Sequence, residues 1–172
     1  MTRKTLVAGC GNIFLGDDAF GSEVARRLAA EELPEGVKVA DFGIRGVHLA
    51  YELLDGYNTA ILVDATPRGE PPGTVYLIEP EVDGGDRAAR AEQAETPLID
   101  AHGMAPHEVL DLLSSLGGSV EHVLVVGCEP AEVRERMGLS EVVEAAIPQA
   151  MQLIRELVQD TAGERDTAQK GA

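Results

Sequence analysis

Short apolar runs alternate along the chain with stretches that repeat apolar residues at helical spacing. Runs typical of buried strands lie at residues 5–8, 37–42, 59–63, 74–78 and 120–126. Helical spacing lies at residues 21–28, 49–54, 107–116 and 140–157. This alternation predicts βαβ units, which place helices on both faces of a mostly parallel sheet. We therefore expect an α/β fold, a single-domain three-layer sandwich around a mostly parallel five-stranded sheet.

One domain is expected over residues 1–160, because 172 residues is the length of a single domain. Residues 80–97 lack apolar periodicity and predict a solvated loop with a short helix. Residues 161–172 are small and polar, so we expect a disordered C-terminal tail. Pro148 lies inside the last helical stretch and predicts either a kink or the junction of two helices.

The chain carries 14 Lys and Arg against 30 Asp and Glu, a formal net charge of −16. This charge argues against nucleic acid and against an anionic membrane surface as partners, because both attract basic proteins. The N-terminal residues lack the apolar segment of a signal peptide, and no run is long enough to span a membrane. We expect a cytoplasmic monomer in which Cys10 and Cys128 are reduced packing residues.

Polar residues gather where the predicted strands end, which is where open α/β sheets bind ligands. Asp17 and Asp18 close the loop after the first strand, Asp64 ends the third strand, and His102 precedes a helix. The glycines of the first loop do not match a dinucleotide or P-loop motif. Two carboxylates ahead of a helix would also repel a phosphate. One of the two could simply cap the helix, and the other would remain available.

A divalent cation is the natural partner for Asp18, Asp64 and His102. Carboxylates combined with a neutral imidazole suit Zn, Ni or Mn better than Mg or Ca. The alternative is that His102 is an ordinary loop histidine and the acids are structural. A serine hydrolase fits poorly because no Gly-x-Ser-x-Gly motif occurs, and Cys10 has no local base to activate it.

Three stretches together resemble the hydrogenase maturation endopeptidases. They are the first loop at residues 11–21 (GNIFLGDDAFG), the strand end at residues 61–65 (ILVDA), and His102 ahead of the helix with Val109 and Leu110. The similarity continues through residues 126–130 and 138–140, and covers about positions 4 to 158. The resemblance implies a cytoplasmic aspartic-type or metal-dependent endopeptidase. Its substrate would be the precursor of a nickel–iron hydrogenase large subunit, from which it removes a C-terminal peptide.

The resemblance also implies roles for individual residues. Asp18, Asp64 and His102 would be the catalytic residues and would bind the nickel already inserted in the precursor, with Zn or Cd able to substitute in vitro. The family often has Glu at the first of these positions, so Asp18 is a shorter ligand that requires the metal to lie closer to the backbone. The metal could polarise the scissile carbonyl or activate a water. Alternatively it only anchors the substrate, and Asp17 acts as the base.

Residues 41–46 (DFGIRG), which include the loop of Gly43, Ile44, Arg45 and Gly46, depart from the glycine-glycine-threonine turn of many family members. We expect this loop to face the substrate, so the departure bears on which hydrogenase is recognised. The acidic charge leaves a basic patch on the precursor as a docking face. The alternative function is a non-enzymatic metal-sensing chaperone of the same large subunit. A third hypothesis is a small-molecule hydrolase on the same sheet.

Overall fold

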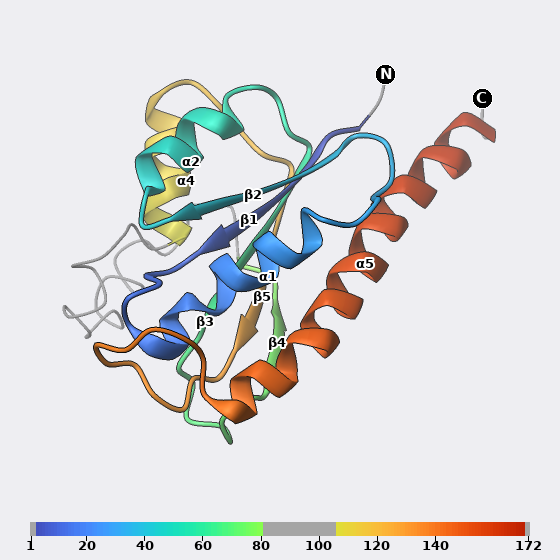
Figure 1. Cartoon of the computed structure of the whole chain (residues 1–172). Helices are drawn as coiled ribbons and strands as arrows, with labels where there is room; N and C mark the ends of the chain where they lie inside the picture. The colour runs from blue at the N-terminus through green and yellow to red at the C-terminus, as the bar shows by residue number, and fades with distance from the viewer. Residues whose placement is uncertain (1–2, 81–105, 171–172) are drawn as a thin grey trace.

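A five-stranded sheet forms the centre of the computed structural model, which describes residues 3–80 and 106–170, with side chains through residue 161 (Figure 1). Its strands are β1 (Thr5–Cys10), β2 (Val37–Gly43), β3 (Thr59–Ala65), β4 (Val75–Ile78) and β5 (His122–Cys128), in the order β2-β1-β3-β5-β4. The β2–β1, β1–β3 and β3–β5 pairs are parallel, whereas β4 runs antiparallel to β5 at one edge. The predicted mostly parallel five-stranded sheet is confirmed.

Helices cover both faces of this sheet, which confirms the three-layer sandwich (Figure 1). The short 3₁₀ helix η1 (Gly16–Ala19) leads into α1 (Phe20–Leu28), and α1 packs with α5 (Glu141–Lys170) on one face. The helices α2 (Gly46–Leu53) and α4 (Pro106–Ser115) pack on the other face. Among the described residues, no helix is both long and apolar enough to cross a membrane.

Alternate residues of the central strands supply two separate cores. Val7 and Ile61 belong to the cluster with α1 and α5, whereas Leu6, Ala8 and Leu62 belong to the cluster with α2 and α4. This is the two-residue period of a strand covered on both faces. It explains why the apolar runs in the sequence are continuous.

Two glycines allow α1 to lie directly on the sheet. A Cβ on Gly21 would overlap the backbone oxygens of Val63 and Cys10, and a Cβ on Gly9 would lie 2.6 Å from the Cβ of Ala25. Because neither position has a side chain, the start of α1 approaches the ends of β1 and β3 closely. The residues just before α1 are thereby held at the C-terminal ends of these strands.

The helix α5 differs from expectation in two respects. It runs through Pro148 as one helix, so the predicted junction of two helices is wrong. It also continues to Lys170, where we expected a disordered tail from residue 161. Extending an existing helix needs no new nucleus, and the Ala, Glu, Arg, Gln and Lys residues of this segment favour helix. The loop predicted at residues 80–97 falls, from residue 81 onward, outside the described residues.

Candidate active site

The order of the strands places the topological switch point of the sheet between the C-terminal ends of β1 and β3. The chain leaves β1 through α1 to reach β2 on one side, and returns through α2, on the opposite face, to reach β3 on the other side. Such a change of direction leaves room outside the strand ends, where ligands of open α/β sheets bind. Asp18 follows β1 at this point, and Asp64 lies near the end of β3.

The first loop brings Asp18 and Asp64 close together. Gly11 has a φ of 130°, and a Cβ at this position would overlap the backbone oxygen of Asp18 and lie 3.5 Å from Asp64 Oδ1. The backbone N–H of Asn12 donates a hydrogen bond to Asp18 Oδ2 at 2.8 Å, which turns this carboxylate back toward the loop. Gly11 is therefore the spacer that lets both acids approach the same backbone.

Burial and the neighbouring charge of Asp18 both perturb the titration of Asp64. Burial and then the negative charge of Asp18 raise the pKa of Asp64 to about 7, although a hydrogen bond from the Ala65 backbone acts in the opposite direction. Like charges that share a site and little water cannot both ionise easily. A cation bound between Asp18 and Asp64 would relieve this repulsion.

Cys10 lies among these acids as an unreactive thiol. Burial, followed by the charges of Asp64, Asp41 and Asp18, raises the pKa of Cys10 far above its usual value. Its thiol makes only a weak contact with the carbonyl oxygen of Ala8, 3.8 Å from Sγ. A protonated thiol is a poor nucleophile, so this environment agrees with the expected packing role. Cys128 is likewise free and fully buried.

Asp41 joins the site from the end of β2. From the sequence, this residue was considered only as part of the loop that differs from the glycine-glycine-threonine turn of the family. Its Oδ1 accepts hydrogen bonds from Ser22 Oγ at 2.7 Å and from the Gly43 N–H at 2.9 Å. These two donors fix the carboxylate although its residue is exposed. The available signal was its place at the end of a parallel strand, the same signal that marked Asp64.

The predicted substrate loop, Gly43 to Gly46, lies beside the first loop. The Gly43 carbonyl accepts a hydrogen bond from the Gly11 N–H at 2.9 Å. The Arg45 guanidinium donates to the backbone oxygens of Asp41 and Phe42, which fixes the turn. Ile44 is half exposed, at 52% of its surface. That this loop contacts the substrate stays a prediction.

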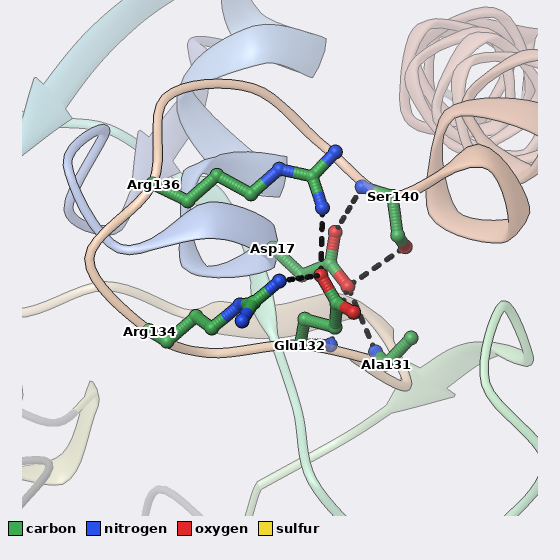
Figure 2. A network of polar contacts seen from close by, with 6 residues as sticks. All are labelled: Asp17, Ala131, Glu132, Arg134, Arg136 and Ser140. Atoms are coloured by element: carbon green, nitrogen blue, oxygen red, sulfur yellow. Dashed lines mark hydrogen bonds and ion pairs between the residues drawn. The ribbon is translucent and has the colours of Figure 1, made fainter.

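Asp17 is a buried structural residue (Figure 2). Its Oδ2 accepts hydrogen bonds from the Ala131 and Glu132 backbones and from Ser140 Oγ, each at 2.8 Å, and its Oδ1 accepts one from the Ser140 backbone at 2.7 Å. Burial acts to raise the pKa of Asp17, but these hydrogen bonds hold it below its usual value. The expected cap is wrong, since neither η1 nor α1 has a side-chain cap. A fully buried carboxylate with both oxygens occupied is also poorly placed to act as a base.

Backbone hydrogen bonds also join the loop that carries Asp17 to the loop that follows β5. The Gly16 N–H donates to the Arg136 carbonyl at 2.8 Å, and the Arg136 N–H donates to the Phe14 carbonyl at 3.0 Å. The Glu132 carboxylate forms an ion pair with Arg136 at 2.7 Å and a longer one with Arg134 at 3.5 Å (Figure 2). The loop after β5 thus holds the loop that carries Asp18.

Glu129 is a second buried acid that sequence reasoning did not single out. Its carboxylate accepts hydrogen bonds from the Arg68 N–H at 2.9 and 3.1 Å, from the Glu70 N–H at 2.7 Å and from the Tyr76 hydroxyl at 2.9 Å. These bonds fix the loop that follows Asp64 at the end of β3. No local sequence pattern predicts them, because the partners are more than fifty residues away.

His102, the third predicted metal ligand, lies outside the described residues. Within residues 3–80 and 106–161, no group of three or more His, Cys, Asp or Glu side chains could hold a metal ion. The structure therefore brings together Asp18 and Asp64, and it leaves the ligand role of His102 as a prediction.

Known proteins resemble this chain over most of its length. A family model described as hydrogenase maturation protease matches residues 22–157. The chain belongs to the hydrogenase maturation protease family. A putative hydrogenase maturation protease of Methanocaldococcus jannaschii is 32% identical over 158 residues, which is 88% of this chain and 94% of that protein. The hydrogenase 2 maturation protease of Escherichia coli is 27% identical over 157 residues, 88% of each chain.

Solved structures of maturation proteases share the fold. The hydrogenase 2 maturation peptidase of Thaumarchaeota archaeon SCGC_AB-539-E09 aligns with a TM-score of 0.69 and 32% identity, over 91% of this chain and 99% of that one. The hydrogenase maturating endopeptidase HybD of E. coli aligns with a TM-score of 0.72 and 26% identity, over 92% and 93%. Membership of the hydrogenase maturation protease family supports a peptidase role in hydrogenase maturation.

Proposed function

We propose that this maturation protease removes the C-terminal extension of a nickel–iron hydrogenase large-subunit precursor, in the cytoplasm and after nickel has been inserted. Asp18, Asp64 and His102 contact the nickel that the precursor carries. The observation that carries this proposal is the approach of Asp18 and Asp64 on either side of Gly11, at the switch point of a family-typical fold. The nickel belongs to the substrate.

The chemical nature of the three proposed ligands supports nickel as the metal of the substrate. Two neighbouring carboxylates, one with a pKa raised to about 7, are stabilised when a cation enters between them. With the imidazole of His102 they form a mixed oxygen and nitrogen set that suits nickel or zinc. Three protein ligands leave further positions for ligands from the precursor, as expected of an open site. Zn or Cd is expected to occupy the same set in vitro.

Asp17 is poorly placed to take the proton of the attacking water, and Asp64 is assigned here to the nickel, whose charge favours the ionised carboxylate. Asp17 is fully buried and already accepts four hydrogen bonds, so it cannot serve in this way without breaking them.

Mass spectrometry of the precursor tests the proposal. Nickel-loaded large-subunit precursor is incubated with the purified protein, and we expect the mass to fall by that of the C-terminal peptide. Asp18→Asn and Asp64→Asn should abolish this change, whereas Asp160→Asn, an exposed acid on α5, should not. An unchanged mass with the wild-type protein, together with stable binding, would instead support the metal-sensing chaperone.

Metal binding by the protease alone tests the ligand set. Calorimetry with Zn, Cd or Ni should show weaker binding for Asp18→Asn, Asp64→Asn and His102→Ala. Affinity should also fall as the pH drops through the histidine range, near an unperturbed pKa of ~6.5, because imidazolium cannot bind a metal. An unchanged affinity in His102→Ala would show that this residue is not a ligand.

A further inference from the structure

Exposed apolar side chains concentrate at the C-terminal edge of the sheet. Eleven large hydrophobic residues are exposed in the described part of the chain, and six of them lie on segments that follow β1, β2 and β5. Met137 and Phe14 are the most exposed of all, at 64% and 62%. We call these six residues the apolar rim: Ile13, Phe14, Ile44, Val47, Val133 and Met137.

The three segments of the apolar rim are joined by backbone hydrogen bonds. The Gly11 N–H donates to Gly43, which ties the first segment to the second. The Arg136 N–H donates to Phe14, and the Gly16 N–H donates to Arg136, which ties the first segment to the third. The buried carboxylate of Asp17 adds four further bonds to the third segment. The rim is therefore a fixed surface, and binding to it requires little additional ordering.

The apolar rim borders three acidic side chains, and the exposed arginines of the same segments, Arg45, Arg134 and Arg136, bind other groups. Asp18 lies in the same loop as Phe14, Asp41 precedes Ile44, and Asp64 adjoins Gly11. None of these three acids forms an ion pair with another described residue, although surface acids elsewhere, such as Glu23 and Glu31, do. A surface that complements this edge must be apolar around a cationic centre. Exposed apolar side chains gathered on neighbouring segments beside a reactive site are typical of a protein-binding surface.

We propose that the apolar rim is the docking surface for the protein substrate, which presents apolar side chains around its bound metal cation. This inference rests on the proposed function, since it assigns the precursor to that surface. Phe14 and Met137 are its main contacts because they have the highest exposed fractions of the six and lie on two loops that are hydrogen-bonded to each other. The rim places the substrate so that its metal enters between Asp18 and Asp64.

Steady-state cleavage of the nickel-loaded precursor tests the rim. The variants are Phe14→Ser, Met137→Ser and the double variant, and the matched control is Leu116→Ser. Leu116 is also an exposed apolar residue, at 40%, but it follows α4 at the opposite edge of the sheet. We expect KM to rise about tenfold for each rim variant, the change typical of losing one important contact residue, with kcat within about twofold of wild type. The control should match wild type in both constants.

The possible outcomes separate the two proposals. If wild type cleaves the precursor and the rim variants keep the KM of the control, the rim inference is overturned while the proposed function stands. If wild type neither cleaves nor binds the precursor, the proposed function is wrong and the assignment of this partner is wrong with it. Sedimentation should show monomers throughout; a wild-type dimer that the rim variants dissociate would show that a second copy of the chain occupies the rim.

Discussion

Replacing Asp64 by Asn should stabilise the metal-free protein in a pH-dependent manner. In the unfolded chain this carboxyl loses its proton near its ordinary value of 3.8, whereas in the folded protein it keeps the proton up to about pH 7. Between these values the folded state binds more protons than the unfolded state. A rise in pH therefore lowers the free energy of unfolding, and the loss is complete above pH 7.

The size of the effect follows from the same two values. A difference of roughly three pKa units corresponds to about 4 kcal/mol at 1.36 kcal/mol per unit. Part of this cost is already present at pH 5, since the unfolded carboxyl is ionised there. The stability advantage of Asp64→Asn over wild type should thus grow by about 2–3 kcal/mol from pH 5 to pH 8. That is a large share of the roughly 5–15 kcal/mol that stabilises a typical domain.

Urea unfolding in a chelating buffer at pH 5, 6, 7 and 8 measures this difference. Asp160→Asn serves as the control, since Asp160 is exposed and its replacement should give a difference that does not vary with pH. Asp18→Asn should reduce the pH dependence, because the charge of Asp18 is the second cause of the raised pKa. A difference between Asp64→Asn and wild type that stays constant within about 0.5 kcal/mol would refute the reasoning.

Two further changes test the scaffold. Asp17→Asn should lower the free energy of unfolding by about 2–4 kcal/mol, because an amide group must face donors that now bind a carboxylate. Thermal denaturation measures this loss beside that of Ser140→Ala, which removes only one of these donors and should cost about 1 kcal/mol. Equal losses for the two variants would contradict a structural role for the Asp17 carboxylate. Removing residues 163–172 should reduce the helical circular dichroism signal but leave the unfolding midpoint unchanged, since Val158 is the last buried residue described in α5. A clearly lower midpoint would show that this segment stabilises the fold.

The fold was predictable because its signals are local. Continuous apolar runs such as residues 59–63 identify strands covered on both faces, and their alternation with helical spacing requires parallel pairing. The antiparallel direction of β4 has no such signal, since Val75–Ile78 reads the same in either orientation. The extension of α5 to Lys170 was missed because small polar residues were taken for disorder, although most of them favour helix.

The candidate site was predictable only in part. Asp18 and Asp64 were found because acids at the ends of parallel strands must meet at one edge of the sheet. The adjacent Asp17 was misjudged because its partners, Ala131, Glu132 and Ser140, lie 114 to 123 residues away. A local sequence pattern cannot show a contact between residues that lie so far apart in the chain. Distant tertiary contacts, and not residue type, decide which of two neighbouring acids is structural.

The hydrogen bonds that Asp17 accepts from Ala131, Glu132 and Ser140 also bear on when this protein can become active during its own synthesis. Asp18 and Asp64 emerge from the ribosome within the first 64 residues, but the loop that holds the Asp18 segment ends at Ser140. Contacts so distant in sequence form late, because a long intervening chain must first be ordered. A nascent or truncated chain that stops before residue 140 therefore carries both acids without the contacts that hold Asp18 in place, and we expect it to be inactive.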